Sequence, residues 1–536
     1  MKKSIIALSV AAAMGGLAGT ATAQPMSPYF PADHLEENFA GVGHILYVPY
    51  FSTQSGNVTA ISIVNTDTYN GKVLKVRFRG ASNSDDVYDF QVFMSPGDVW
   101  TAGIARDADG RSRLDTADKS CTLPANVNGK FITSRTTGPA AADRPEETRE
   151  GYIEILNMAD IPGIPESYRS DPYLENYWAL WDAVKHVNGV APCTPAVLNA
   201  LTRETVTGGA ALWPGLSYPT TGLMANWTII NVDKVIAYSG GALALEARAT
   251  GNQPAQGNLV YWDQRATPLT QQQAESNTAD PLLRGAVPVV QGARYDLPDM
   301  STPYLPVGPS GITAPFAQAK VLSDAIAVDE VAFEFFNTAS IGASTDWVIT
   351  FPTRRYWAAV KYGSTPAPVY NKGSDGNVYF TSSNTEMGSV NGAGKAYQLC
   401  SRLGVSAIAF FDREETPQVS DDIVISPGTP TQLSLCGEVT VVSVNGSTQA
   451  GSATFANVAR ANLSNSFKEG WGYLSVPATT GNAYTGDTSG TYYFGLPMVA
   501  RQFSRVNNTT TQQYYGLSFP GRVTYWGYYF PDVNVP

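Results

Sequence analysis

The residues best suited to acid–base chemistry are scarce in this sequence, which contains three histidines. They are His34, His44 and His186. A Ser-His-Asp hydrolase needs one histidine placed between a serine and a carboxylate. Only His34 follows a carboxylate directly, that of Asp33, and neighbours in a strand point to opposite faces of a sheet. His186 falls at the end of an expected helix, where a lone histidine more often complements the helix dipole than moves a proton.

Sequence motifs that carry known chemistry are also missing. The chain has no G-x-S-x-G nucleophile elbow, H-E-x-x-H zinc helix, G-x-x-x-x-G-K phosphate loop or G-x-G-x-x-G dinucleotide fingerprint. The sequence therefore predicts no catalytic residues and favours a protein that is not an enzyme.

A glycosidase needs two facing carboxylates and no histidine. The formal candidates are Asp263, Glu330, Glu334 and Asp346. Nothing in their spacing selects a pair. Trp and Tyr side chains near these acids are able to stack on sugars, although packing in a sandwich core and at its edges is the commoner use of such rings.

An acidic stretch after Trp100 resembles a fragment of a calcium loop, because hard oxygen ligands cluster there around a glycine. The weak calcium candidates are Asp107, Asp109, Asp115 and Asp118. The match is incomplete, since a bidentate Glu is missing at the last position and Arg111 and Arg113 would oppose a cation. A solvated hairpin tip is the preferred interpretation, and no other cofactor is expected.

The chain has four cysteines, which allow three disulfide pairings. No C-x-x-C pair is present, so a zinc site is a poorer interpretation than two structural disulfides. We expect Cys121 to pair with Cys193 and Cys400 with Cys436, because each bond then closes a loop inside one half of the chain.

The first 23 residues have the form of a secretory signal peptide: Lys2 and Lys3, an apolar run to Leu17, and a final Ala-Thr-Ala. Cleavage leaves Gln24 first. The apolar run is shorter than the roughly 20 residues that span a bilayer, and no later apolar segment reaches that length. The sequence therefore predicts an exported protein, at the cell surface, outside the cell or in the periplasm, without a transmembrane segment in the mature chain.

The net charge argues against one class of partner, and the composition favours one class of secondary structure. Loss of Lys2 and Lys3 from the 35 basic residues leaves 33 against 46 acidic ones. Such an anionic surface repels phosphates, so nucleic acid is not an expected partner. Aromatic residues make up 11% of the chain, with 49 glycines and 35 prolines, a composition that favours strands and turns.

The stretch 57–100 has the clearest strand pattern in the chain, and we expect the other elements to be organised around it. Leu74, Val76 and Phe78 alternate with Lys75, Arg77 and Arg79, which predicts a strand with one face in a core and the other in water. Asn70-Gly71 suits a tight hairpin, and Ser95-Pro96-Gly97-Asp98 predicts a second turn. This pattern is typical of a β-sandwich.

Together with the later segments, this stretch predicts a mainly all-β fold with two sandwich-like units. The first unit covers 24–250 and carries a helical insertion at about 166–205, with helices expected at 172–187 and 194–201. A long loop excursion follows over 251–312. The second unit covers 313–536 and repeats features of the first, including a strand closed by Asn-Thr and a Glu-Gly-aromatic strand opening (Glu150 and Glu469). A duplication is therefore expected.

Two segments, KVLKVRFRGASNSDDVYDFQVFMSPGDVW (72–100) and STDWVITFPTRR (344–355), resemble parts of exported, largely uncharacterised cell-surface proteins of Gram-negative bacteria. The resemblance touches both halves of the chain. It implies an envelope or surface location and a β-rich fold, and it supplies no catalytic residues.

These observations favour a non-enzymatic structural or interaction protein of the cell surface, of the S-layer, sheath, fibre-subunit or adhesin type. The alternative is a secreted glycan-active enzyme or glycan-binding protein, with surface glycans as partners. We also expect self-association, because strand edges are templates for further pairing. The segments expected to take part are the aromatic C-terminal stretch 516–530 and the N-terminal segment 24–37.

Overall fold

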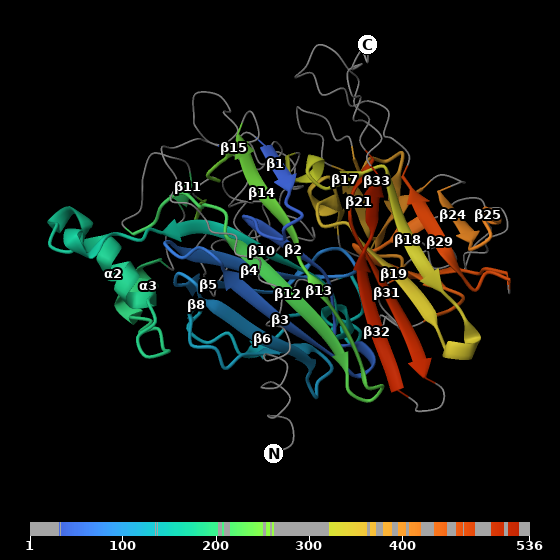
Figure 1. Cartoon of the computed structure of the whole chain (residues 1–536), viewed down its shortest axis with the longest axis horizontal. Coiled ribbons are helices and arrows are strands. Elements are labelled where there is room, and N and C mark those ends of the chain that lie inside the picture. Colours follow the sequence, from blue (N-terminus) through green and yellow to red (C-terminus); the bar gives the residue numbers. More distant parts are fainter. Residues whose placement is uncertain are drawn as a thin grey trace, which may run out of the picture.

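The computed structural model describes residues 32, 34–134, 136, 138–201, 206–207, 215–249, 253–257, 260–261, 321–361, 365–370, 379–388, 395–403, 407–419, 434–447, 457–464, 466–476, 495–508 and 513–524. Within these residues the chain is built from largely antiparallel β-sheets, so the predicted all-β class is confirmed. Figure 1 shows the sheets arranged as two neighbouring groups, with the N-terminal half on the left and the C-terminal half on the right.

The first unit is a sandwich of two sheets. Sheet 1 contains, in spatial order, β1 (His34–Glu37), β14 (Leu243–Ala249), β2 (Ile45–Ser52), β10 (Glu150–Ile161), β4 (Gly71–Gly80), β5 (Asp86–Met94) and β8 (Cys121–Leu123), with β15 (Gln253–Pro254) beside β14. Sheet 2 contains β13 (Ile236–Gly241), β12 (Leu223–Asn231), β3 (Asn57–Asn65), β6 (Val99–Arg106), β7 (Ser112–Asp115) and β9 (Gly129–Lys130). Apolar side chains of both sheets meet between them, as where Phe90 of β5 lies 5.3 Å from Trp100 of β6 between ring centroids.

The second unit is also a sandwich. Sheet 3 contains β25 (Pro417–Val419), β24 (Ile408–Asp412), β29 (Glu469–Ser475), β18 (Glu330–Phe336) and β33 (Arg522–Thr524). Sheet 4 contains β28 (Asn457–Ala461), β27 (Val439–Val444), β19 (Ser344–Thr350), β31 (Val499–Asn508) and β32 (Gln513–Pro520). Trp347 of sheet 4 stacks on Phe333 and Phe410 of sheet 3, with centroid separations of 4.7 and 4.9 Å.

The remaining elements among the residues described are short. The minor strands are β11 (Val206–Thr207) with β16 (Val260–Tyr261), β17 (Ala327–Val328) with β30 (Leu496–Pro497), β20 (Ala358–Lys361) with β21 (Ala367–Tyr370), and β22 (Thr385–Met387), β23 (Leu399–Arg402) and β26 (Ser434–Cys436). The short 3-10 helices are η1 (Gln54–Gly56), η2 (Glu146–Thr148), η3 (Glu166–Tyr168), η4 (Pro172–Leu174), η6 (Ala339–Ile341) and η7 (Arg354–Tyr356).

The helical insertion lies where the sequence predicts it. Its helices are α2 (Glu175–Val184) and α3 (Pro195–Leu201), and Figure 1 shows them projecting at the left end of the first sandwich. Asp171 caps the preceding turn by accepting a hydrogen bond from the backbone N–H of Tyr173. No helix among the residues described is long and apolar enough to cross a bilayer.

Both disulfides have the predicted pairing. Cys121 bonds to Cys193 and so ties the helical insertion to β8, while Cys400 of β23 bonds to Cys436 of β26. Each bond stays inside one half of the chain. Two disulfides are typical of a protein that folds in an oxidising compartment.

One expectation about the first sandwich is wrong. The alternation along β4 predicts that Lys75, Arg77 and Arg79 face water, yet every residue of β4 is buried. Lys75 pairs with Asp89 of the neighbouring strand β5, and the second unit covers the part of this face that carries Arg77 and Arg79. Arg355 of η7 approaches to 4.0 Å from Glu154 of β10, and Glu154 also accepts a hydrogen bond from Arg79.

The two sandwiches share one continuous hydrophobic core. Phe503 of β31 has no exposed surface and packs against Tyr50, Trp227 and Tyr238 of the first unit, with ring centroids 5.3–5.9 Å away. Gly516 of β32 lies so close to β13 that a Cβ atom would stand 2.2 Å from the carbonyl oxygen of Ala237. The units are therefore packed as closely as the layers of a single domain.

The predicted duplication stays a prediction. Both halves are antiparallel sandwiches, and the two Glu-Gly-aromatic strands, β10 and β29, are interior strands of their sheets. The sheets of the two halves differ in strand number and order. Apart from 253–257 and 260–261, the expected loop excursion over 251–312 lies outside the residues described.

Candidate functional site

The three histidines do not gather into one site. His44 is fully buried and its Nδ1 accepts a hydrogen bond from the backbone N–H of Ala247 at 3.1 Å. Burial, together with the nearby positive charge of Lys72, lowers the pKa of His44 to about 3, so its ring is neutral. His34 lies on β1, where its Nε2 stands 3.2 Å from a carboxylate oxygen of Glu36.

His186 comes closest to a catalytic arrangement. Its Nδ1 lies 3.1 Å from Oγ of Ser95 and 3.7 Å from Oδ2 of Asp98. In a Ser-His-Asp triad the serine and the carboxylate contact different ring nitrogens, because one accepts a proton while the other is held by the acid. Here both groups face the same nitrogen. The contacts instead join the segment just after α2 to the turn between β5 and β6.

The proposed glycosidase acids are not brought together. Asp263 lies outside the residues described. Glu330 and Glu334 are on the same side of β18, four residues apart, which places their Cα atoms about 13 Å apart along the strand. Asp346 is buried on β19, and because its neighbour Trp347 packs toward sheet 3, Asp346 faces the opposite side of sheet 4.

Three of the four calcium candidates pair with cations of the chain itself. Asp107 and Asp109 each lie 3.1 Å from Nζ of Lys130, and Asp109 also pairs with Arg111. The remaining two have other partners: Asp115 pairs with Arg113, and Asp118 accepts hydrogen bonds from the backbone of Thr101 and from Ser120. Among the residues described, no three or more His, Cys, Asp or Glu side chains form a group that could hold a metal ion.

Two buried charge clusters were not predicted from the sequence. One lies where the sandwiches meet and contains Glu154 with the guanidinium groups of Arg77, Arg79 and Arg355. Burial works to raise the pKa of Glu154, but the arginines outweigh it and hold that pKa below its usual value. Next to it, Arg354 of η7 binds Glu438 at 3.0 Å. No alternation pattern identifies such pairs, because their partners are more than 70 residues apart.

The other buried cluster, here called the Lys72 cluster, consists of Lys72, Asp160, Asp67, Thr220 and Asn157. Nζ of Lys72 donates to Oδ1 and Oδ2 of Asp160 at 2.8 and 2.9 Å, and to Oδ2 of Asp67 at 3.2 Å. Thr220 accepts from Nζ through its hydroxyl at 2.7 Å, and Asn157 donates to Asp160. The side chain of Lys72 has no exposed surface.

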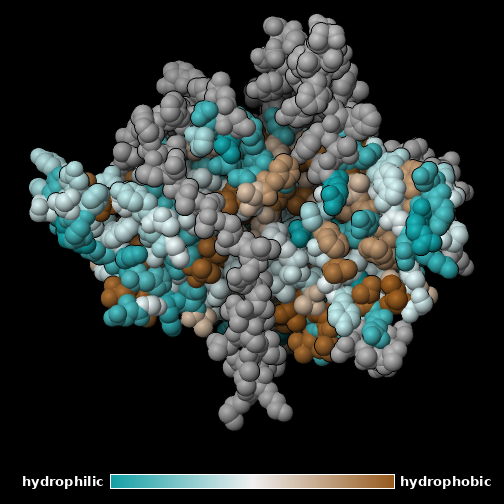
Figure 2. Space-filling view, viewed as in Figure 1, coloured by the Kyte–Doolittle hydropathy of each residue, from teal (hydrophilic) through white to brown (hydrophobic). Residues whose placement is uncertain are grey.

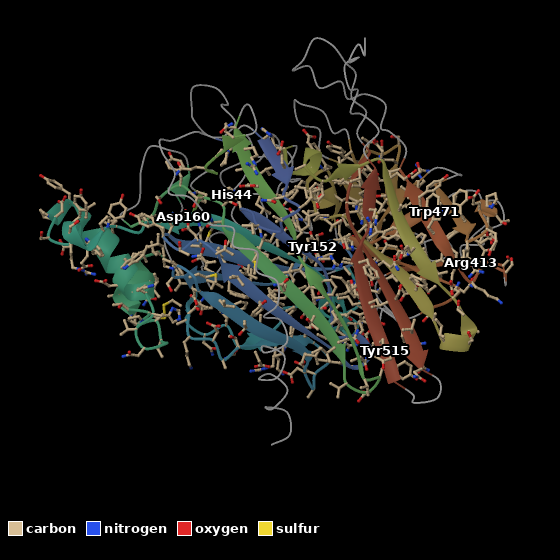
Figure 3. The ribbon with its side chains drawn as sticks, viewed as in Figure 1. His44, Tyr152, Asp160, Arg413, Trp471 and Tyr515 are labelled. Atoms are coloured by element: carbon tan, nitrogen blue, oxygen red, sulfur yellow. A yellow bond between two sulfur atoms is a disulfide. The ribbon has the colours of Figure 1, made fainter. Side chains whose placement is uncertain are left out.

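Aromatic side chains gather on the outer face of sheet 3, and we call Phe411, Trp471 and Tyr473 the outer aromatic cluster. The rings of Phe411 and Trp471 stack with centroids 4.7 Å apart, and Tyr473 lies 6.1 Å from Trp471. A Cβ atom at Gly472 would stand 2.8 Å from both Trp347 and Phe410, so that residue faces the core and its two neighbours face outward. Figure 3 shows Trp471 and Arg413 toward the right-hand end of the molecule, away from the first sandwich.

Polar groups border this cluster. Glu334 of β18 is exposed and is the cross-strand partner of Trp471. Arg413, beyond the end of β24, lies 3.9 Å from Glu469 at the start of β29. An exposed ring beside a carboxylate and a guanidinium provides both an apolar face and hydrogen-bonding groups.

A second exposed apolar feature lies on β32, and we call Tyr515, Leu517 and Phe519 the β32 row. They alternate along the strand and are 52%, 40% and 43% exposed. Figure 2 shows apolar side chains in the lower middle of the view, where Figure 1 places the lower ends of β12, β13 and β32. Val232 and Val235, in the turn between β12 and β13, are also exposed.

A scan against protein-family models, a search of curated proteins and a search of solved structures each found no match to this chain. The fold and the described sites define a disulfide-bonded protein of two joined antiparallel sandwiches. Among the residues described it contains two buried charge clusters, and the outer aromatic cluster and the β32 row lie on the second sandwich.

Proposed function

We propose that the chain is an exported, non-enzymatic interaction protein of the cell surface, of the structural or adhesin type. The observation that carries this proposal is the β32 row, three large apolar side chains exposed at alternating positions of one strand. Exposed apolar side chains grouped in this way mark protein contact surfaces more often than isolated ones do. The second copy of the chain is the partner that fits, because the row lies on the last strand of sheet 4 in the sheet order.

Two contacts within the chain bear on which surface a second copy would contact. A Cβ atom at Gly516 would meet the backbone of β13, so the face of β32 opposite the β32 row is covered within the chain and the row is the face left exposed. Residues His34–Glu37 of the N-terminal segment pair with β14 of the same chain as β1. Contact through the side chains of the β32 row therefore fits better than hydrogen bonding along the whole strand edge.

The test combines localisation with assembly. Cell fractionation should find the protein with the cell surface, and negative-stain microscopy and light scattering should find assemblies of the purified chain. Leu517→Glu together with Phe519→Glu should shift the mass to that of a monomer. Tyr173→Glu, at an aromatic residue of the helical insertion that is 91% exposed, should leave assembly unchanged. A wild-type chain that stays a soluble periplasmic monomer at high concentration would refute the proposal.

Glycan binding is the second candidate, and the outer aromatic cluster favours it. Sugar rings stack on exposed aromatic faces, while carboxylates and guanidinium groups bind their hydroxyls. Trp471 has the exposed face and Glu334 is its polar neighbour. A glycan array probed with wild type, Trp471→Ala and Tyr173→Ala separates the outcomes: binding lost only in Trp471→Ala supports this function, and no binding by the wild type removes it.

A further inference from the structure

The Lys72 cluster is unlike the other lysine contacts of the described structure. Lys72 and Asp160 are direct cross-strand partners on β4 and β10, and their side chains are 0% and 1% exposed. Lys75 and Asp89 also pair, but their side chains are 8% and 20% exposed. Lys130 pairs with Asp107 and Asp109 in contact with water. Lys72 is thus enclosed with a carboxylate where water has little access.

A second carboxylate completes the cluster. Asp67 lies 3.2 Å from Nζ of Lys72 and is 3% exposed. One ammonium therefore faces two buried carboxylates. Removing these three charged groups from water has a free-energy cost that their mutual attraction has to offset. Burial raises the pKa of Asp160. Burial also acts to raise that of Asp67, but Lys72 and the backbone N–H groups of Asn70 and Tyr69 lower it overall.

The two carboxyl groups are thus unlike each other, with Asp160 the readier to be protonated and Asp67 the readier to be anionic. A carboxylic acid is attacked by an amine more easily than a carboxylate is, because it carries no charge to repel the nitrogen lone pair. The hydroxyl of Thr220 accepts from Lys72 and donates to Asp160, so it links the nitrogen to the oxygen that would leave.

We propose that Lys72 and Asp160 condense to form an intramolecular amide that joins β4 to β10. Nζ of Lys72 first passes one proton to Asp160 through the hydroxyl of Thr220, which leaves a neutral amine beside a carboxylic acid. The amine attacks Cγ of Asp160 and forms the new C–N bond, and Asp67 accepts the second proton that the nitrogen loses. One C–O bond of Asp160 then breaks, and its oxygen leaves as water with the first proton and with the second, which Asp67 returns. The reaction converts one ammonium and one carboxylate into one amide and one water, and it needs no oxidant, reductant or cofactor.

Placement and burial are what favour this step. Well-oriented groups within one molecule reach effective concentrations of about 10⁵–10⁸ M. Exclusion of water from the cluster slows the reverse hydrolysis. The arginine pairs of the other buried cluster cannot react in this way, since a guanidinium stays protonated and is a poor nucleophile.

The test is the mass of the full exported chain after reduction of its disulfides. The wild type should be lighter than its sequence by one water molecule, and peptide mapping should find a branched peptide that joins residues of β4 to residues of β10. Lys72→Arg keeps the charge but should restore the full sequence mass. Asp67→Asn should leave most of the chain uncondensed, because the proton acceptor is lost.

Lys75→Arg is the matched control and should keep the mass deficit. A wild-type chain at its full sequence mass would overturn the proposal and leave Lys72 and Asp160 as an ion pair. A lost water that maps to any other residue would overturn it equally. Both results come from the wild-type protein, so they stand even where a variant fails to fold.

Discussion

Phe503 is the residue whose removal best tests whether the two sandwiches form one cooperative unit. Its ring lies wholly inside the contact between the units, against Tyr50, Trp227 and Tyr238. Replacement by alanine should cost about 3–5 kcal/mol, because three surrounding rings keep the vacated space open. For roughly 350 described residues the unfolding entropy is about 0.7 kcal/mol per kelvin. The melting temperature should therefore fall by about 4–7 °C.

Differential scanning calorimetry is the suitable assay, because it counts transitions as well as locating them. Wild type and Phe503→Ala should each show a single transition, displaced in the variant. Phe411→Ala removes the same side chain from the outer aromatic cluster and should cost no more than about 1 kcal/mol. Two separate transitions, of which the substitution moves only one, would contradict a shared core. A shift no larger than that of Phe411→Ala would do the same.

Three further outcomes follow from buried groups. Glu154→Gln removes the carboxylate shared by three guanidinium groups and should cost about 3–5 kcal/mol in urea unfolding, whereas Glu334→Gln on the surface should stay within about 0.5 kcal/mol. The folded-state pKa of His44, about 3, lies below its unfolded value, so the unfolded chain binds more protons and stability is lost as pH falls below 6.5. This loss should reach about 2 kcal/mol between pH 7 and pH 5, and His44→Gln should abolish that part of the pH dependence. Joint replacement of Cys400 and Cys436 by serine opens a loop with a sequence separation of 36 and should lower the free energy of unfolding by about 4 kcal/mol, while an unchanged denaturation midpoint would show that the bond adds nothing.

Much of the fold follows from local patterns. Alternating apolar residues and turn dipeptides locate β3 to β6, and the helical period locates α2 and α3, because these signals depend on neighbours within a few residues. The disulfide pairing follows from the preference for closing loops within one half. The outer aromatic cluster could be predicted only in part. Trp471 and Tyr473 alternate along one strand, which places them on the same face of the sheet, but the neighbouring residues do not show that this face is exposed to solvent.

The amino-acid sequence is sufficient to predict the class of fold, the sparseness of catalytic groups and the acidic, strand-rich composition. The surroundings of the charged residues follow only from the way the sheets pack together. Arg77 and Arg79 alternate like a solvent-facing row, yet the second sandwich covers them and supplies Arg355 beside their common partner. Lys72 meets Asp160 because β4 and β10 are paired, although 88 residues separate them. Burial is a property of the assembled layers, and a period-two pattern records which residues share a face but not what later lies on it.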